Sequence, residues 1–245
     1  MSLVAVLGVG GLGCPAALAL GRAGVRLRLV DEDRVERSNL HRQGLYEEAD
    51  VGRPKVAAAR EALLRAAPGA AVEARQTHFS PDTMDDLLDG VDLVVEGTDA
   101  FGAKFLVADR CAARGVPVVH GACVGWYGTV LPVAPGEGPC YRCVFEDAPG
   151  CDEDAGTCVT AGVYGPVPAL VGALLAVEAL RLLRGDHGNA GRVLWYDAWR
   201  QVARELSPRR RSRCPNHQPD TIHPRGGLMV PAPRSTGGRL SWPSR

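Results

Sequence analysis

The sequence has no excess of charge of either sign. Its 28 lysines and arginines match its 28 aspartates and glutamates, so the formal net charge at pH 7 is zero. A neutral chain lacks the global field that draws nucleic acids or acidic membrane surfaces to a basic protein. Internal repeats are also missing, which argues against a repeat architecture. We therefore expect neither a nucleic acid nor a membrane as a partner.

A secretory leader and an uninterrupted apolar span are missing too. Met1 is followed at once by an apolar stretch and a glycine turn, with no basic segment between them. The longest apolar run, Val163–Leu183, approaches the length of a membrane span, but it contains Glu178 and Arg181 and two prolines. Because a charged side chain at bilayer depth costs several kcal/mol, we expect a buried helix there and a cytoplasmic protein.

Disulfide bonds are not expected, although the chain contains eight cysteines. In a chain of this length without a leader, metal binding or catalysis is the more common use of cysteine. Cys14, Cys111 and Cys123 are interpreted as small buried apolar residues. The other cysteines are candidates for chemistry.

The first 124 residues alternate regularly between strand-like and helix-like stretches. This alternation predicts βαβ units and a mostly parallel sheet with helices packed on it. Strands are expected at Leu3–Leu7, Val25–Val30, Val72–Gln76, Val91–Val95 and Val116–Val119, and helices at Pro15–Ala23, Lys55–Ala66, Pro81–Leu88 (capped by Ser80) and Ala103–Arg114.

Residues 125–217 have a different pattern. Gly125–Val133 and Arg192–Leu206 resemble antiparallel strands, and a cysteine-containing loop and the long apolar helix lie between them. Residues 218–245 are rich in Pro, Gly, Arg and Ser without periodicity, and we expect them to form a disordered tail. The sequence thus predicts one α/β domain over residues 1–217, with a nucleotide-binding half (1–124) and a second half (125–217).

A glycine-rich turn follows the first expected strand. Gly8, Gly10 and Gly13 form the pattern G-x-G-x-x-G, in which the turn is tight and the backbone can approach a phosphate closely. The N-terminus of the next helix offers free N–H groups to that anion. Asp31 ends the second strand about 20 residues on, where a carboxylate can accept from ribose hydroxyls. The combination predicts a Rossmann-like nucleotide site, although glycines alone could serve only to pack strand against helix.

A polar segment dense in charge, residues 31–43, follows the second strand, and Lys55 opens the next helix. Hydride transfer to a nicotinamide does not need cations at the phosphates, whereas nucleotidyl transfer does, because charge builds up as pyrophosphate leaves. Arg42 and Lys55 are suited to hold that charge. Asp99, at the carboxyl end of a parallel strand, is placed to hold Mg²⁺. A solvated surface with salt bridges remains an alternative interpretation of these residues.

Two cysteine-containing pairs have the spacing of metal ligands. Cys140 and Cys143 form one C-x-x-C pair, and Cys214 and His217 form a second pair with the same spacing. Together they would provide three thiolates and one imidazole for a tetrahedral, structural Zn²⁺. A redox-active dithiol at Cys140 and Cys143, or thiols with no such use, are the alternatives.

The ordered motifs resemble the MoeB/ThiF/HesA family of adenylyltransferases, which activate ubiquitin-like and sulfur-carrier proteins and are related to the E1 enzymes. The resemblance runs from about residue 3 to 217. The matching stretches are residues 8–15 with the glycine turn, 31–43 with Ser38-Asn39-Leu40-His41-Arg42-Gln43, 52–55 (Gly-Arg-Pro-Lys), 97–99 (Gly-Thr-Asp), 119–121 (Val-His-Gly), 136–143 with the first cysteine pair, and 158–163 (Cys-Val-Thr-Ala-Gly-Val).

This resemblance implies a role for each matching residue. Arg42, Lys55 and Asp99 would be catalytic, with Asp99 holding Mg²⁺ near the attacking carboxylate. Cys158 would be catalytic as well: the cysteine at the matching place joins covalently to the carrier in some family members and is dispensable in others. Cys151, nearby in the sequence, is the alternative candidate for this role. The residues that would contact ATP are Gly8, Gly10, Gly11, Gly13, Asp31, Asp33, Asn39, Arg42, Gln43, Lys55 and Asp99.

The reaction implied by the resemblance is attack of a carrier protein's C-terminal glycine on the α-phosphate of ATP, which releases pyrophosphate. The carrier would be a small ubiquitin-like protein ending in Gly-Gly, the enzyme a homodimer, and its bound groups ATP, Mg²⁺ and Zn²⁺. His217 differs from the second C-x-x-C that is usual in the family, but imidazole is an acceptable zinc ligand.

Two departures keep other functions open. Family members generally begin with a segment whose arginine reaches the ATP of the other subunit, and no such segment stands before the first strand here. Ala100 also stands where the family commonly has Asn. A nucleotide- or partner-binding homologue with weakened chemistry is therefore one alternative, and a NAD-dependent oxidoreductase is a second.

Overall fold

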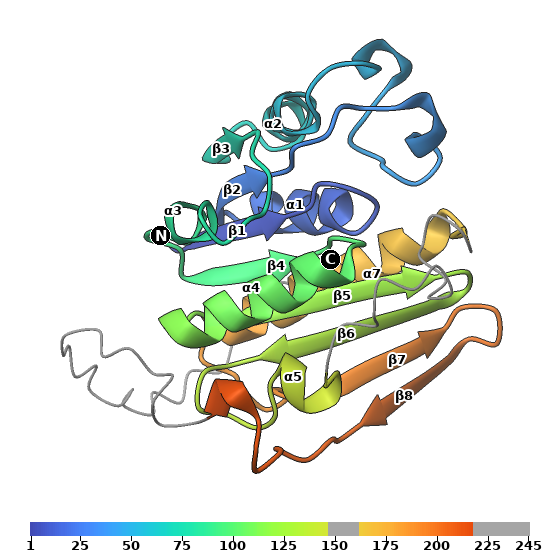
Figure 1. Cartoon of the computed structure of the whole chain (residues 1–245). Helices are drawn as coiled ribbons and strands as arrows, with labels where there is room; N and C mark the ends of the chain where they lie inside the picture. The colour runs from blue at the N-terminus through green and yellow to red at the C-terminus, as the bar shows by residue number, and fades with distance from the viewer. Residues whose placement is uncertain (147–161, 218–245) are drawn as a thin grey trace, which may run out of the picture.

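One continuous eight-stranded sheet organises the molecule (Figure 1). The computed structural model describes residues 1–146 and 162–217. The strand order is β3-β2-β1-β4-β5-β6-β7-β8. The strands are β1 (Leu3–Leu7), β2 (Arg26–Val30), β3 (Val72–Arg75), β4 (Leu93–Glu96), β5 (Val118–Val124), β6 (Tyr127–Val133), β7 (Val193–Asp197) and β8 (Val202–Leu206).

The sheet is parallel in its first half and antiparallel in its second. Strands β3, β2, β1, β4 and β5 pair in parallel, and β5, β6, β7 and β8 pair in antiparallel fashion. The carboxyl ends of the parallel strands therefore meet at one edge, which is where ligands bind in open α/β sheets. The fold class expected from the sequence is confirmed.

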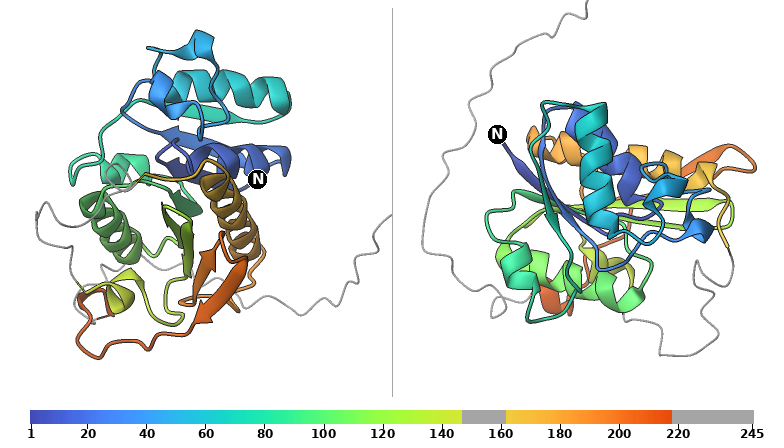
Figure 2. Two further views of the ribbon diagram at one scale, coloured as in Figure 1. Left: turned by 90° about the vertical axis from the view of Figure 1, so that its right-hand side faces the viewer. Right: turned by 90° about the horizontal axis from the view of Figure 1, so that it is seen from above.

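Helices cover both faces of the sheet (Figure 2). Helices α1, α2 and α7 pack on one face, and α3, α4 and α5 lie on the other. Alternation in β1 serves both layers, since Val4 and Val6 belong to the first core and Leu3, Ala5 and Leu7 to the second. The helices are α1 (Gly13–Arg22), α2 (Lys55–Ala66), α3 (Met84–Leu87), α4 (Phe101–Arg114), α5 (Tyr141–Val144) and α7 (Pro166–Leu183), with short 3₁₀ turns η1 (Arg37–Asn39), η2 (Glu48–Asp50) and η3 (Pro215–His217).

Two expected elements differ from the structure. The helix predicted over Pro81–Leu88 is a single turn, α3, because the Ser80 and Thr83 side chains bond each other's backbone N–H groups and hold the preceding residues in a turn. The strand predicted over Val116–Val119 instead runs from Val118 to Val124, because it pairs along its whole length with β6. Pairing with β6 is a tertiary contact that local patterns do not encode.

The long apolar run does form a helix, α7, packed against α1, β5 and β6. Close approach is possible because Gly128 lies beneath it: a Cβ there would come within 2.2 Å of Val171. Within the part of the chain that the structure describes, α7 is the one helix long and apolar enough to cross a membrane, judged by length and composition only. One of its faces is buried in the core, as the charges at Glu178 and Arg181 led us to expect.

Candidate nucleotide site and metal cluster

The glycine turn links β1 to α1 in a conformation that needs glycine. Gly8 has a φ of +84°, in the left-handed region. A Cβ on Gly13 would lie 1.9 Å from the Gly8 carbonyl oxygen, so α1 can begin this close to β1 only without a side chain there. A Cβ on Gly8 would lie 3.1 Å from the backbone nitrogen of Thr98. The glycine turn and the turn after β4 are therefore packed against each other.

Gly10 and Gly13 should respond differently to alanine. We expect Gly13→Ala to destabilise the fold by about 2 kcal/mol or more, because its methyl group meets backbone. A Cβ on Gly10 would have the Gln43 amide nitrogen 3.7 Å away as its nearest neighbour, so Gly10→Ala should leave the melting temperature nearly unchanged. Its methyl would instead occupy the space expected for a phosphate and weaken ATP binding at least ~10-fold. Thermal melts and ATP titration separate the two effects; equal ATP affinity in Gly10→Ala and the parent would contradict a phosphate at this turn.

Asp31 is buried at the carboxyl end of β2 and pins the glycine turn. Its carboxylate accepts from the Val9 N–H at 2.7 Å and from the Asp33 N–H at 2.9 Å. Burial raises the pKa of this carboxyl, while the charge of Lys55 opposes the rise. The sequence predicts that Asp31 binds the ribose of the nucleotide. The structure shows that the same carboxylate also holds the glycine turn in place, through its bond from the Val9 N–H.

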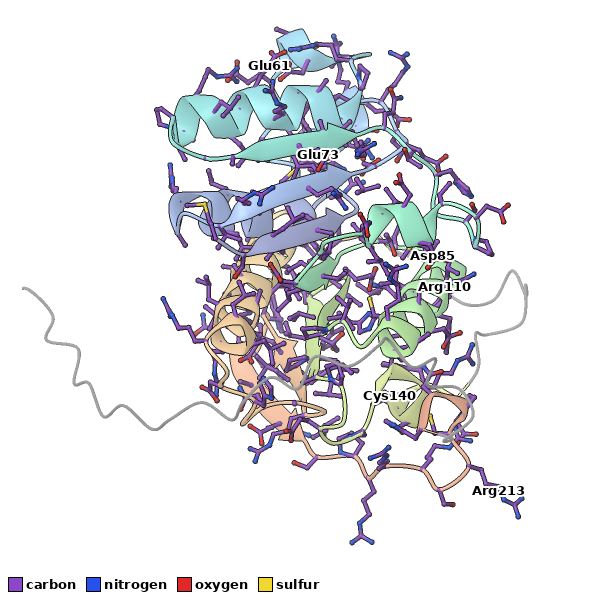
Figure 3. All side chains as sticks on the ribbon, turned by 90° about the vertical axis from the view of Figure 1, so that its left-hand side faces the viewer. Glu61, Glu73, Asp85, Arg110, Cys140 and Arg213 are labelled. Carbon is purple, nitrogen blue, oxygen red and sulfur yellow. The ribbon has the colours of Figure 1, made fainter. Side chains whose placement is uncertain are left out.

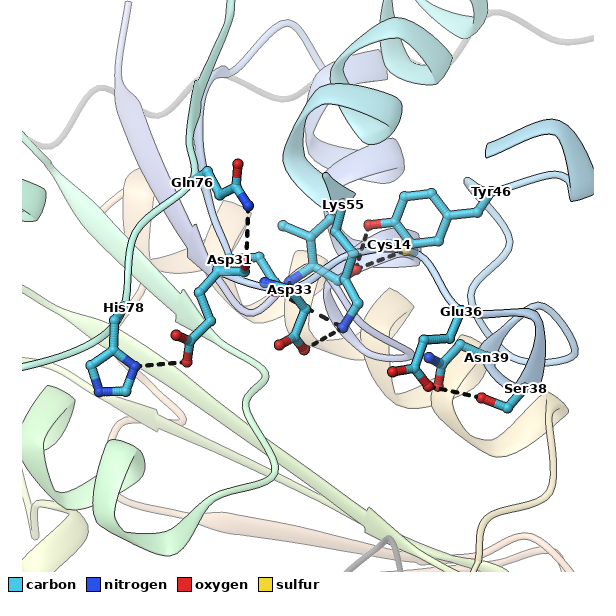
Figure 4. A network of polar contacts seen from close by, with 12 residues as sticks. Cys14, Asp31, Asp33, Glu36, Ser38, Asn39, Tyr46, Lys55, Gln76 and His78 are labelled. Carbon is cyan, nitrogen blue, oxygen red and sulfur yellow. Dashed lines mark hydrogen bonds and ion pairs between the residues drawn. The ribbon is translucent and has the colours of Figure 1, made fainter. Parts of the chain in front are cut away.

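Lys55 points from the start of α2 toward the two aspartates (Figure 4). Its Nζ lies 2.7 Å from Asp33 Oδ2 and 3.9 Å from Asp31 Oδ1. The Lys55 side chain is buried, whereas Asp33 is exposed. The geometry therefore supports a cationic centre beside the expected ribose site rather than a freely solvated surface pair.

Asn39, Arg42 and Gln43 come from one compact segment around η1 that lies over the glycine turn. Arg42 Nη2 donates to Asn39 Oδ1, and the Arg42 Cδ lies 3.7 Å from where a Cβ on Gly11 would be. Gln43 is buried, and its Oε1 has no hydrogen-bond partner among the described residues. These side chains lie beside the glycine turn, and their contact with phosphates stays a prediction.

Asp99 follows β4 at the same edge of the sheet. Its side chain is exposed and makes no hydrogen bond or ion pair with any residue that the structure describes. Since Thr98 packs against Gly8, Asp99 lies next to the glycine turn. The structure thus assembles a phosphate turn, two cations and an acceptor carboxylate at one edge, and the roles of these residues stay predictions.

Sequence reasoning missed a buried polar cluster that bonds Thr98, the residue before Asp99. Glu96, Lys104 and His120 are all nearly inaccessible to solvent, and the Glu96 carboxylate bonds both of the other side chains. His120 is buried inside β5, four residues before that strand ends at Val124. The available signal was an acidic residue ending an otherwise apolar strand, which burial makes costly unless it is paired.

The two cysteine-containing pairs meet in one cluster, and Cys140 lies at the opposite end of the molecule from Glu61 of α2 and Glu73 of β3 (Figure 3). One potential ligand atom from each of Cys140, Cys143, Cys214 and His217 lies within 4.8 Å of all the others. The Cys140 and Cys143 Sγ atoms are 3.8 Å apart, and the Cys140 and Cys214 Sγ atoms 3.5 Å. Tetrahedral thiolates at about 2.3 Å from Zn²⁺ would be separated by about 3.8 Å, so the arrangement fits the metal.

One further observation fits a cation in this cluster. The buried Nε2 of His217 has no partner among the described residues. The predicted ligand set is therefore brought together in space. Cys158 and the expected tail at 218–245 lie outside the described residues.

The comparisons with known proteins agree with this geometry. The sequence matches the ThiF family over residues 1–216. The chain belongs to the ThiF family. A sulfur carrier protein adenylyltransferase from Thermus thermophilus is 43% identical over 219 residues, covering 86% of this chain and 80% of its own. A SAMP-activating enzyme E1 from Haloferax volcanii is 40% identical over 220 residues, covering 87% of this chain and 79% of its own.

Solved structures support the same fold. MccB of E. coli crystallised with ATP has a TM-score of 0.74 at 22% identity, and the match covers 87% of this chain and 66% of MccB. At that identity the likeness concerns the fold alone. The relatives named above are adenylyltransferases or activating enzymes, so the family resemblance and the enzyme class expected from the sequence are confirmed.

Proposed function

We propose that this protein catalyses the ATP-dependent adenylation of the C-terminal glycine of a small ubiquitin-like sulfur carrier, with release of pyrophosphate. The observation that carries this proposal is the convergence of the glycine turn with Arg42, Lys55 and Asp99 at the carboxyl edge of the parallel strands. The relative that is 43% identical is itself named a sulfur carrier protein adenylyltransferase. A nicotinamide oxidoreductase has no comparable use for these cations.

In the proposed reaction, one oxygen of the carrier's terminal carboxylate forms a bond to the α-phosphorus of ATP. The bond from the α-phosphorus to the oxygen bridging to the β-phosphate breaks, and pyrophosphate leaves with that electron pair. The products are an acyl-adenylate and pyrophosphate. No proton needs to be removed, because the attacking carboxylate is already ionised at neutral pH.

The protein's contribution is then orientation and charge stabilisation. The backbone of the glycine turn and the N-terminus of α1 would bind phosphate oxygens. Arg42 and Lys55 would stabilise the charge that builds up on the departing pyrophosphate, an effect that is largest in a site prepared before the reaction. Asp31, already at the end of β2, would accept from the ribose hydroxyls. ATP would thus replace Asp33 as the main partner of the Lys55 ammonium.

Two metal ions belong to the proposal. Asp99 would hold Mg²⁺, which would neutralise charge on the phosphates. Cys140, Cys143, Cys214 and His217 would hold Zn²⁺, which with four protein ligands is structural.

The deciding experiment is carrier-dependent exchange of labelled pyrophosphate into ATP. With a recombinant sulfur carrier ending in Gly-Gly, we expect exchange well above the rate without carrier. The same carrier lacking its last glycine, or with an amidated C-terminus, is the matched control and should give none. Absence of exchange with a panel of Gly-Gly carriers, together with tight ATP binding, would instead support the binding homologue. Tight binding of NAD with no binding of ATP would support the oxidoreductase.

The remaining expectations are part of the proposal. We propose a homodimer, a cytoplasmic location, and no role for nucleic acid or a membrane. No disulfide bond joins any of the six cysteines that the structure describes. A role for Cys158 in covalent attachment of the carrier stays a prediction that its replacement by serine would test.

A further inference from the structure

We infer that Glu96, held by Lys104 and His120, is a positioning residue that sets the place of Asp99 relative to the phosphate turn. The inference rests on the proposed function for the identity of the reaction. It depends on three features of the described residues: a fully buried polar cluster, its direct bonds to Thr98, and the packing of Thr98 against Gly8.

The Glu96 carboxylate makes two bonds to the residue before Asp99. Its Oε1 accepts from the Thr98 backbone N–H at 2.7 Å and from the Thr98 hydroxyl at 2.5 Å. In the turn after β4, the backbone and the side chain of Thr98 are therefore both bonded to one carboxylate. Bonds to an ionised acceptor are shorter and stronger than neutral ones, so this turn is held more firmly than an ordinary loop.

The carboxylate is held in turn by two other elements. Lys104, from α4, donates to both Glu96 oxygens at 3.1 and 2.9 Å and to the Gly121 carbonyl at 2.6 Å. The Nδ1 of His120, from β5, lies 3.1 Å from Glu96 Oε2. These bonds use all three donors of the ammonium group. Glu96 is thus fixed between β4, α4 and β5, and it cannot shift without breaking several bonds.

The cluster is kept charged in spite of its burial. Burial alone would raise the pKa of Glu96, but Lys104 and His120 outweigh it and lower that pKa to about 2. Burial lowers the pKa of His120, so its imidazole is neutral beside the ion pair. A buried ion pair is a poor means of stabilisation, because packed apolar residues are often as stable or more so. The bonds of this ion pair to the turn that carries Asp99 suggest a different role, which is to position that turn.

Thr98 connects the Glu96 cluster to the glycine turn, where ATP is proposed to bind. Because a Cβ on Gly8 would lie only 3.1 Å from the Thr98 nitrogen, the backbones of the two turns are in close contact. Asp99 is the next residue, and its own side chain has no bond to the described residues that could hold it. Its position therefore depends on Thr98 and, through Thr98, on Glu96.

The test compares variants of Thr98 and Lys104 in the full chain. Thr98→Val removes the hydroxyl bond at nearly constant volume, and we expect kcat of carrier-dependent exchange to fall about 10-fold while the Kd of ATP without Mg²⁺ stays within about 2-fold. Thr98→Ser keeps the hydroxyl and should recover most of kcat. Lys104→Met should lower kcat further, by about 30-fold, because Glu96 loses its cation.

Arg28→Met is the matched structural control. Arg28 is a buried cation of the same sheet that donates to Glu73 and to two backbone carbonyls, away from Asp99. The Arg28→Met variant should have a lower melting temperature than the parent and an unchanged kcat. Full kcat in Thr98→Val, or an equal loss in Arg28→Met, would overturn the inference. A parent protein without exchange would instead overturn the proposed function, so the two failures are distinguishable.

Discussion

Asp99→Asn is expected to slow carrier-dependent exchange by about 10²- to 10³-fold, equivalent to about 3 to 4 kcal/mol of transition-state stabilisation. The change keeps the shape of the side chain and removes its charge. Asp99 is exposed after the carboxyl end of β4 and makes no bond to the described residues, so the substitution should leave the stability of the fold unchanged. Initial rates over a range of Mg²⁺ concentrations would measure the effect, and the apparent affinity for Mg²⁺ should fall together with kcat.

Asp82→Asn is the control for this prediction. Asp82 is an exposed aspartate in the turn before α3, and it loses the same charge without lying beside the glycine turn. Its exchange rate should stay within about 2-fold of the parent. If Asp99→Asn behaved like Asp82→Asn, the carboxylate after β4 would not hold a metal, and the placement of Mg²⁺ would be wrong.

Loss of the metal cluster is expected to have the largest effect on stability. The purified protein should contain about one Zn²⁺ per chain, and Cys214→Ser should remove it. We expect the melting temperature to fall by about 10 °C or more, because a structural zinc contributes several kcal/mol and each kcal/mol shifts the melting temperature of a chain this size by about 2–4 °C.

The reason is that the cluster anchors the end of the described chain. Cys214 is fully buried, and Asn216 and Arg142 both bond Asp109 of α4. Cys111→Ala is the control, since it removes a buried thiol of α4 without touching the cluster. Metal-free protein with the same melting temperature as the parent would contradict a structural zinc, and a Cys140–Cys143 disulfide found by thiol titration would favour the redox alternative.

The half of the fold that contains the glycine turn was largely predictable because its signals are local. The strand Leu3–Leu7 and the helix Lys55–Ala66 have the bounds that the apolar pattern predicted. Asp31 could be assigned to the end of β2 by its distance from the glycine turn. Such features depend on a few consecutive residues, so they can be predicted without knowing which tertiary contacts the segment makes.

The cluster of four potential metal ligands was also predictable, although Cys140 and Cys214 lie 74 residues apart. The C-x-x-C and C-x-x-H spacings can each be recognised alone, and the chemistry of zinc then supplies the reason to join them. What the spacing could not predict was their anchor, the bidentate pair of Arg142 with Asp109.

Sequence alone therefore determined the family and the enzyme class and predicted the residues that the structure gathers around the glycine turn, because those follow from short motifs whose chemistry is specific. Tertiary structure alone decided that Asp31 also holds the glycine turn, that β5 continues past His120 beside β6, and that Glu96 is bound to Lys104 and Thr98. Those facts depend on which side chains meet after folding. A buried carboxylate and an exposed one look alike in a sequence, and only packing distinguishes the group that holds a ligand from the group that holds the site in place.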